Sequence, residues 1–142
     1  MRSLFDVGVL LALVDPDHIH NRRVRSWWTN EQQSGWASCP LSQNGFVRII
    51  SQPSYLRPKS TSEAIALLRR ATQRPEHQFW PDDVSVLDDK IFDHSRVLGP
   101  RQITDIYLLA LATQHGGRFV TLDRSVSLSA VRIAKAENLV IL

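Results

Sequence analysis

Two short apolar runs in this chain stop directly at an aspartate. Ser3–Phe5 is followed by Asp6, and Arg118–Leu122 is followed by Asp123. A short run of bulky residues that ends abruptly at a polar side chain is typical of a buried strand that reaches the edge of a sheet. Because ligand sites of open α/β sheets lie outside the carboxyl ends of the strands, we expect both acids at such an edge.

A third aspartate opens a segment that is apolar on almost every face. Asp105 precedes the run Ile106–Ala112. This pattern predicts a helix buried between the layers of the fold, with Asp105 in its first turn. Gly116 and Gly117 then supply the unrestrained backbone that can end the helix before the next strand.

The rest of the chain alternates helices with short strands. Helices are expected over Val7–Val14, His20–Gln32, Leu41–Ile50, Ser60 or Thr61 to Ala71, and Ser85–Phe92, and strands at Trp36–Ser38, Phe79–Trp80 and Leu139–Leu142. Helices between parallel strands predict an α/β fold, a three-layer α/β/α sandwich with a mostly parallel central sheet. Without a linker or an internal repeat, residues 1–142 are expected to form one domain. Trp28 is expected in the core and Trp27 at a half-exposed position, because adjacent helical residues cannot both point inward.

Each of the three aspartates also has an ordinary structural interpretation. Asp6 can cap a helix, Asp105 can complement a helix dipole, and Asp123 can begin a turn. Three carboxylates that converge on one sheet edge would, however, repel one another without a cation. Taken together, they favour a divalent-metal site.

Charge and cysteine content bear on the partners and the compartment. The net charge is +3, the sequence pI is about 9.5, and of the 17 basic residues all but Lys59, Lys90 and Lys135 are Arg. A basic surface around an acidic pocket fits a phosphodiester substrate, although coding bias explains an Arg-rich composition equally well. Cys39 is alone, so no disulfide framework is expected. No run approaches the roughly 18 apolar residues of a membrane span, and we expect a cytoplasmic protein without a signal peptide or membrane association.

Four segments, taken in order, carry a resemblance to a known family. They are Leu4–Leu10, Cys39–Ile49, Thr104–Ala112 and Phe119–Asp123. Together they resemble PIN-domain ribonucleases, and most of all the VapC toxins of bacterial toxin–antitoxin pairs, over essentially the whole chain. The resemblance implies a PIN-like fold and an endoribonuclease dependent on Mg²⁺ or Mn²⁺. It also implies inhibition by a cognate VapB-type antitoxin.

The resemblance assigns roles by position. Asp6, Asp105 and Asp123 match the family's catalytic acids and metal ligands. Asn44 stands where family members usually carry Glu, and is the fourth proposed catalytic position; its amide offers an oxygen but no charge. Gly8 departs from a common Asn. These departures leave an alternative open, a catalytically weakened PIN-like domain that binds RNA or a protein partner without cleavage.

Further residues are candidates for supporting roles. One or two cations would lower the pKa of a bound water and stabilise charge on the phosphate. Thr104 and Thr121 are candidate hydrogen-bond donors to the carboxylates, although a helix cap and a strand position explain them equally well. Arg48 and Arg124 are candidate contacts for RNA phosphate, and a homodimer is a candidate assembly.

Overall fold

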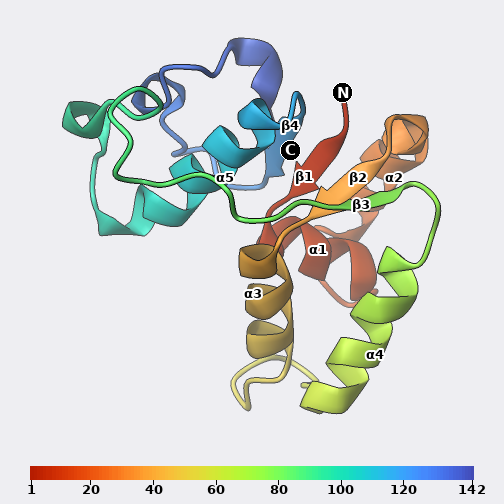
Figure 1. Cartoon of the computed structure of the whole chain (residues 1–142). Helices are drawn as coiled ribbons and strands as arrows, with labels where there is room; N and C mark the ends of the chain where they lie inside the picture. The colour runs from red at the N-terminus through yellow and green to blue at the C-terminus, as the bar shows by residue number, and fades with distance from the viewer.

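The computed structural model describes residues 1–142. Its five parallel strands form one sheet in the order β3-β2-β1-β4-β5 (Figure 1). Their bounds are β1 Ser3–Phe5, β2 Trp36–Ser38, β3 His77–Phe79, β4 Arg118–Thr121 and β5 Leu139–Ile141. β1 lies at the centre, with Phe5 paired to Val120 of β4. This register brings Asp6 level with the end of β4.

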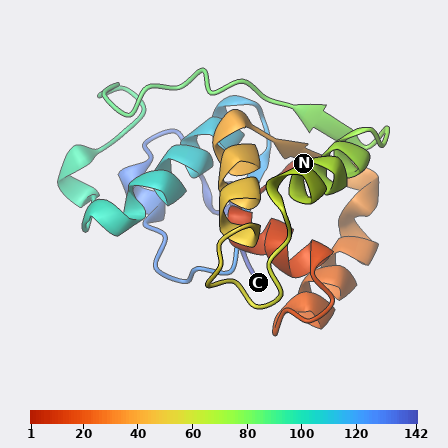
Figure 2. The same cartoon turned by 90° about the horizontal axis from the view of Figure 1, so that it is seen from below.

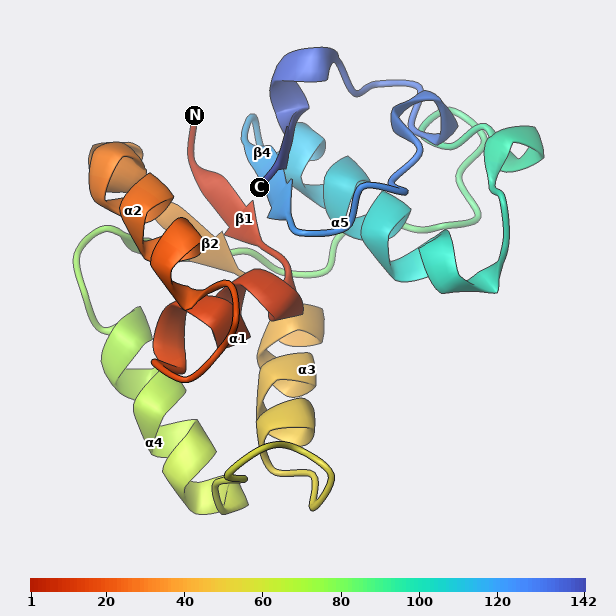
Figure 3. The same cartoon turned by 180° about the vertical axis from the view of Figure 1, so that it is seen from behind.

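Five α-helices cover the sheet. They are α1 Val7–Val14, α2 Asn21–Glu31, α3 Pro40–Ile50, α4 Thr61–Thr72 and α5 Ile103–Gln114. Figure 3 shows α1 and α2 against β1 and β2, with α5 beside β4. Seen from below in Figure 2, α3 stands between α5 and α4. None of the helices has the length and apolar character that a membrane span requires.

The hydrophobic residues form two clusters, one on each face of the sheet. Leu4 and Phe119 pack with the buried residues of α5. Phe5 and Val120, their neighbours in sequence, point to the opposite face and pack with residues of α1 to α4. This alternation is the period of a strand with both faces buried. The predicted three-layer α/β/α sandwich is confirmed, and its sheet is parallel throughout.

Local signals explain where several helices begin and end. Pro40 occupies the first turn of α3, where its missing N–H has no intrahelical partner to lose. Ser60 caps α4: its hydroxyl accepts a hydrogen bond from the Glu63 N–H at 3.1 Å, and the Glu63 carboxylate accepts one from the Ser60 N–H. After α5 the chain turns at Gly116, which has a φ of 70°.

Residues between β3 and α5 depart from the sequence predictions. The helix predicted over Ser85–Phe92 was wrong: this stretch forms turns. The Ser85 hydroxyl accepts a hydrogen bond from the Leu87 N–H, and the Asp88 carboxylate accepts one from the Lys90 N–H. Short polar side chains that bind nearby backbone in this way compete with helix formation.

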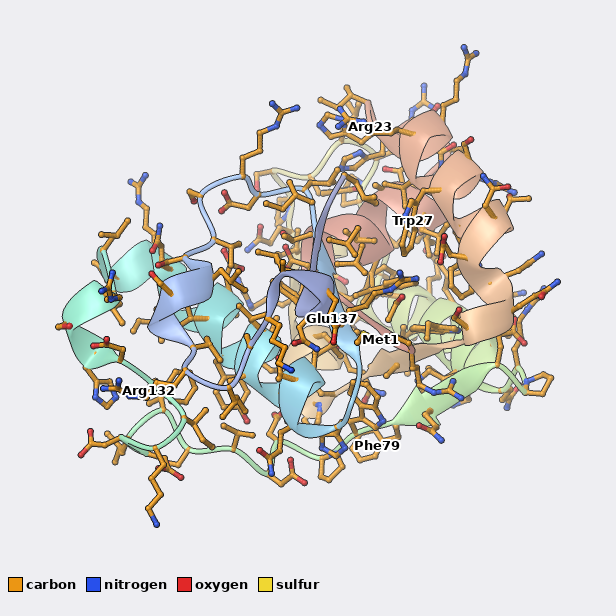
Figure 4. All side chains as sticks on the ribbon, turned by 90° about the horizontal axis from the view of Figure 1, so that it is seen from above. Met1, Arg23, Trp27, Phe79, Arg132 and Glu137 are labelled. Carbon is orange, nitrogen blue, oxygen red and sulfur yellow. The ribbon has the colours of Figure 1, made fainter.

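Two aromatic predictions also need correction. The strand predicted at Phe79–Trp80 occupies His77–Phe79, and Trp80 lies outside it. Trp28 is not a core residue, because it and Trp27 are both half-buried. The Trp28 ring meets Phe5 edge-on at 5.2 Å between centroids. Trp27 also packs against the Phe5 cluster, from the side of α2 that faces the strands (Figure 4), and the Arg118 guanidinium lies 5.2 Å from its ring centroid.

Candidate active site

Asp6 lies between β1 and α1. Its backbone N–H donates to the Val120 carbonyl at 3.0 Å, which extends the pairing of β1 with β4 by one residue. Asp6 occupies the position before the first turn of α1 in an extended conformation, yet its side chain makes no capping hydrogen bond. The nearby N–H groups of Val7 and Gly8 do favour the charged carboxylate. The N–H groups at the start of α1 therefore help to stabilise the charge of Asp6.

Thr121 connects two of the three acids. Its hydroxyl donates to Asp6 Oδ2 at 2.9 Å and accepts from the Asp123 N–H at 3.0 Å. Thr121 is fully buried at the end of β4. Because the hydroxyl has one proton, its donation to Asp6 leaves its oxygen free to accept from Asp123. The position of Asp6 and the path of the backbone at Asp123 are thus set by one side chain.

Asp105 meets the other two acids from the first turn of α5. Burial raises its pKa to about 7, with further contributions from the charges of Asp6 and Asp123 and from a hydrogen bond shared with Asp123. Burial likewise raises the pKa of Asp6, and the charge of Asp123 adds to this rise. The three carboxylates are therefore electrostatically coupled.

Asp123 is the acid whose charge the protein stabilises most directly. Its Oδ1 accepts hydrogen bonds from the Ser125 N–H at 2.8 Å and the Ser125 hydroxyl at 2.7 Å. These two bonds lower the pKa of Asp123. A proton bound to the pair Asp105 and Asp123 would therefore reside on Asp105, whose pKa is about 7.

The donors of this site fit a hard divalent cation. No group of three His, Cys, Asp or Glu side chains stands ready in ligand geometry. The available oxygens are nonetheless carboxylates, the donors that Mg²⁺ and Mn²⁺ prefer. Burial raises the pKa of Asp6 and Asp105, neighbouring negative charge adds to both rises, and a bound cation would relieve that repulsion. Asp6, Asp105 and Asp123 are the residues that would hold such an ion.

The other predicted residues lie apart from this coupled group. Thr104 is exposed on α5, and neither it nor Asn44 makes a hydrogen bond with the acids. Asn44 and Arg48 line a groove between α3 and α4. Arg124 is exposed beside Asp123 and forms no salt bridge.

Sequence reasoning missed two features of α3. Gly45, next to Asn44, is the residue that packs on α1: a Cβ at this position would lie 2.7 Å from Val7 Cγ2. The Gln43 amide donates to the Ser38 hydroxyl at 2.9 Å, and that hydroxyl also bonds to His77 Nε2 at 2.8 Å. The only signal in the sequence was the polar character of Gln43 beside a glycine.

The fold is a parallel α/β sandwich. Two carboxylates follow its central strands and a third lies at the start of a buried helix, an arrangement typical of α/β proteins with an acidic active site. The chain belongs to the PIN-domain family, whose model matches residues 3–132. It is 55% identical to Ribonuclease VapC44 of Mycobacterium tuberculosis over 139 residues, which cover 98% of each chain. It is also 40% identical to Ribonuclease VapC39 of that organism over 131 residues, covering 92% of this chain and 94% of the relative. The expected membership in the VapC group of PIN-domain proteins is confirmed.

The hydroxyl of Thr121 gives a direct test of how the acids are held. Thr121→Val removes the donor to Asp6 and leaves the Asp123 N–H without its acceptor, so we expect Mg²⁺ affinity to fall about 10- to 100-fold. Thr121→Ser keeps the hydroxyl and should stay close to wild type. Calorimetric titration of both variants measures the difference. Equal affinities for Val and Ser would mean that the bond to Asp6 does not organise the site.

Proposed function

We propose that this chain is the toxin of a VapBC-type toxin–antitoxin pair and that it cleaves RNA internally with the help of Mg²⁺ or Mn²⁺. The observation that carries the proposal is the convergence of three acids: Thr121 links Asp6 to Asp123 by hydrogen bonds, and Asp105 shares a hydrogen bond with Asp123. The relatives named ribonucleases support RNA as the substrate. Such a substrate favours the cytoplasm as the place of action.

The chain's own residues prepare the site before a cation arrives. Thr121 holds Asp6 through a 2.9 Å hydrogen bond, and Ser125 keeps Asp123 charged. All three carboxylates can act as ligands only when Asp105, whose pKa is raised to about 7, is ionised. The cation, when bound, supplies a water of lowered pKa and charge stabilisation for the phosphate.

Residues at and around the acids are proposed to contact the RNA substrate and an inhibitor protein. Exposed Arg124 next to Asp123 is proposed to contact a phosphate of the substrate. Asn44 remains the proposed neutral substitute for the family's usual Glu. A cognate VapB-type antitoxin is proposed to occupy the acids with a basic side chain, since an Arg fork matches a carboxylate. A homodimer is the proposed assembly.

Incubation of the purified chain with total RNA tests this function. Fragments with defined internal ends should form in Mg²⁺ or Mn²⁺, and chelation by EDTA should reduce their formation at least about 100-fold, because the cation generates the nucleophile and stabilises the developing charge. Sequencing of the fragment ends separates internal cutting from trimming. RNA binding without cleavage in either cation would contradict the proposal and favour the weakened PIN-like domain.

A further inference from the structure

A groove of about 560 Å³ lies between α3 and α4. Figures 1 and 2 show α3 standing between α4 and α5, so the groove flanks α3 on the side away from α5. The apolar part of its lining consists of Val47 on α3 and of Ile65 and Leu68 on α4. Leu68 is buried, whereas Ile65 is 43% exposed. The fold therefore leaves apolar surface open between these helices.

Two arginines border this apolar surface from opposite helices. Arg48 comes from α3 and Arg69 from α4, and both are exposed. Neither forms a salt bridge, although Arg57, Arg74 and Arg118 each pair with a carboxylate. Unpaired guanidinium groups on both sides of a groove favour an anionic ligand, and their planar forks match phosphate oxygens.

Polar side chains at one end of the groove can form hydrogen bonds with a planar ligand. The Asn44 side chain is exposed and lines the groove, so its amide can both donate to and accept from a ligand. Gln43 donates its amide N–H to Ser38, which leaves its carbonyl oxygen as an acceptor. Side-chain amides form paired hydrogen bonds with the edges of nucleobases. A ligand that matches all three parts of the groove needs an anionic group, an apolar face and an edge that pairs with amides. Nucleotides combine these features.

The beginning of α3 connects the groove to the sheet edge that carries Asp6. α3 begins at Pro40, directly after β2, at the same sheet edge from which Asp6 emerges. Gly45 of α3 packs on Val7, the residue after Asp6, and the neighbouring Asn44 lines the groove. A nucleic-acid strand that crosses the beginning of α3 can therefore contact both places.

We infer that this groove binds an unstacked base of the substrate RNA, with the adjoining phosphates on Arg48 and Arg69, and so helps to select the sequence that is cut. Recognition of RNA commonly uses single-stranded bases that are splayed out onto apolar or guanidinium surfaces. The inference rests on the proposed ribonuclease function, and it names the part of the protein that reads the substrate.

Arg69 and Arg70 give a matched pair for the test. They are adjacent, exposed and unpaired on α4, but only Arg69 lines the groove. Binding of fluorescein-labelled single-stranded RNA is measured with the full chain in EDTA, which prevents cleavage. Arg69→Ala and Arg48→Ala should each weaken binding about tenfold, the effect of losing one charge-assisted hydrogen bond. Each should also reduce the slope of log K against log salt by about 0.7. Arg70→Ala should remain within about twofold of wild type by the same estimate.

The base contact is tested separately from the phosphate contacts. Ile65→Ala removes apolar surface from the groove without a change in charge. It should broaden the sequence preference at the cleavage sites mapped in Mg²⁺, while the salt slope stays that of wild type. Melting temperatures of all variants are compared first, so that a loss of fold is recognised.

Several outcomes would overturn the inference. If Arg48→Ala and Arg69→Ala bind RNA as Arg70→Ala does, the groove does not contact RNA. If they lose only a co-expressed acidic protein partner and keep RNA, the groove is a protein-docking surface. If wild type cuts RNA and the groove variants cut the same sites with the same KM, this inference fails and the proposed function stands. If wild type neither binds nor cuts RNA, both fail.

Discussion

Each of the variants Asp6→Asn, Asp105→Asn and Asp123→Asn should cleave RNA at least about 100-fold more slowly than wild type. Even the loss of a residue that only supports a metal ligand lowers metal affinity or activity about 10- to 100-fold. Asn keeps the shape of the side chain but removes a charge that a hard cation requires. Initial rates on a defined RNA in saturating Mg²⁺ measure the effect. The loss should lie in kcat as well as in metal affinity, because the charge acts on the reacting phosphate.

Asp93 is a matched control for Asp123. Asp93 Oδ1 accepts hydrogen bonds from the Ser95 N–H at 3.2 Å and the Ser95 hydroxyl at 2.6 Å, the same arrangement that Asp123 makes with Ser125. Both residues therefore shape a local turn, but only Asp123 shares a hydrogen bond with Asp105. Asp93→Asn should leave cleavage unchanged. Equal activity of the two variants would show that Asp123 is only a turn residue.

The sequence predicts the fold and the proximity of the three acids for a physical reason. An apolar run that ends in Asp indicates a buried strand that stops at the sheet edge, and this holds for Asp6 and Asp123. An unbroken apolar run after Asp105 reports a helix buried among layers. Parallel strands then bring their carboxyl ends together, so three residues far apart in the chain meet.

Orientation within an element is where sequence reasoning fails. Thr121 lies at the end of β4, and its buried hydroxyl contacts Asp6 and the Asp123 N–H. Thr104 and Asp105 are adjacent on a helix, about 100° apart around its axis, and Thr104 faces away. The same uncertainty of helix rotation applies to Asn44, because only the packing of Gly45 on Val7 fixes which side of α3 meets α1.

Local competition explains the failure at Ser85–Phe92. Leu87 and Ile91 are four residues apart, the spacing of one helical face. In the structure, Ser85 and Asp88 bind backbone N–H groups within two residues and hold the chain in turns. Phe92 is still buried, through a bridge to Val131 rather than through a helix. A hydrophobic pattern reports burial more reliably than it reports the backbone that achieves it.

Asp105→Asn should stabilise the metal-free protein, and the gain should grow with pH. The pKa of Asp105 is raised from 3.8 to about 7 in the folded state. The folded state therefore binds more protons than the unfolded state between these values, and wild type loses stability as pH rises through that window. Asn does not titrate, so the variant avoids this loss. The difference should be small near pH 4 and reach about 2 to 4 kcal/mol at pH 8, the lower figure allowing for partial exposure.

Urea unfolding in EDTA at several pH values between 5 and 8 measures this difference. His18 and His77, whose pKa values are lowered mainly by burial, titrate in both proteins, so their effects cancel. Asp93→Asn is a control for which the free energy of unfolding should change in the opposite direction. Hydrogen bonds from Ser95 lower the pKa of Asp93, so loss of this carboxylate should destabilise the protein equally at pH 5 and pH 8.

Added Mg²⁺ should reverse the order of stability at pH 8. Wild type gains free energy by mass action with the bound ion, whereas Asp105→Asn, with one charged ligand fewer, gains less. The same carboxylate would then be destabilising without the cation and stabilising with it, as expected of a group kept for binding rather than for folding. A pH-independent difference between wild type and Asp105→Asn in EDTA would instead mean that neither burial nor the neighbouring acids raise the pKa of Asp105, and the electrostatic argument for one shared site would fail.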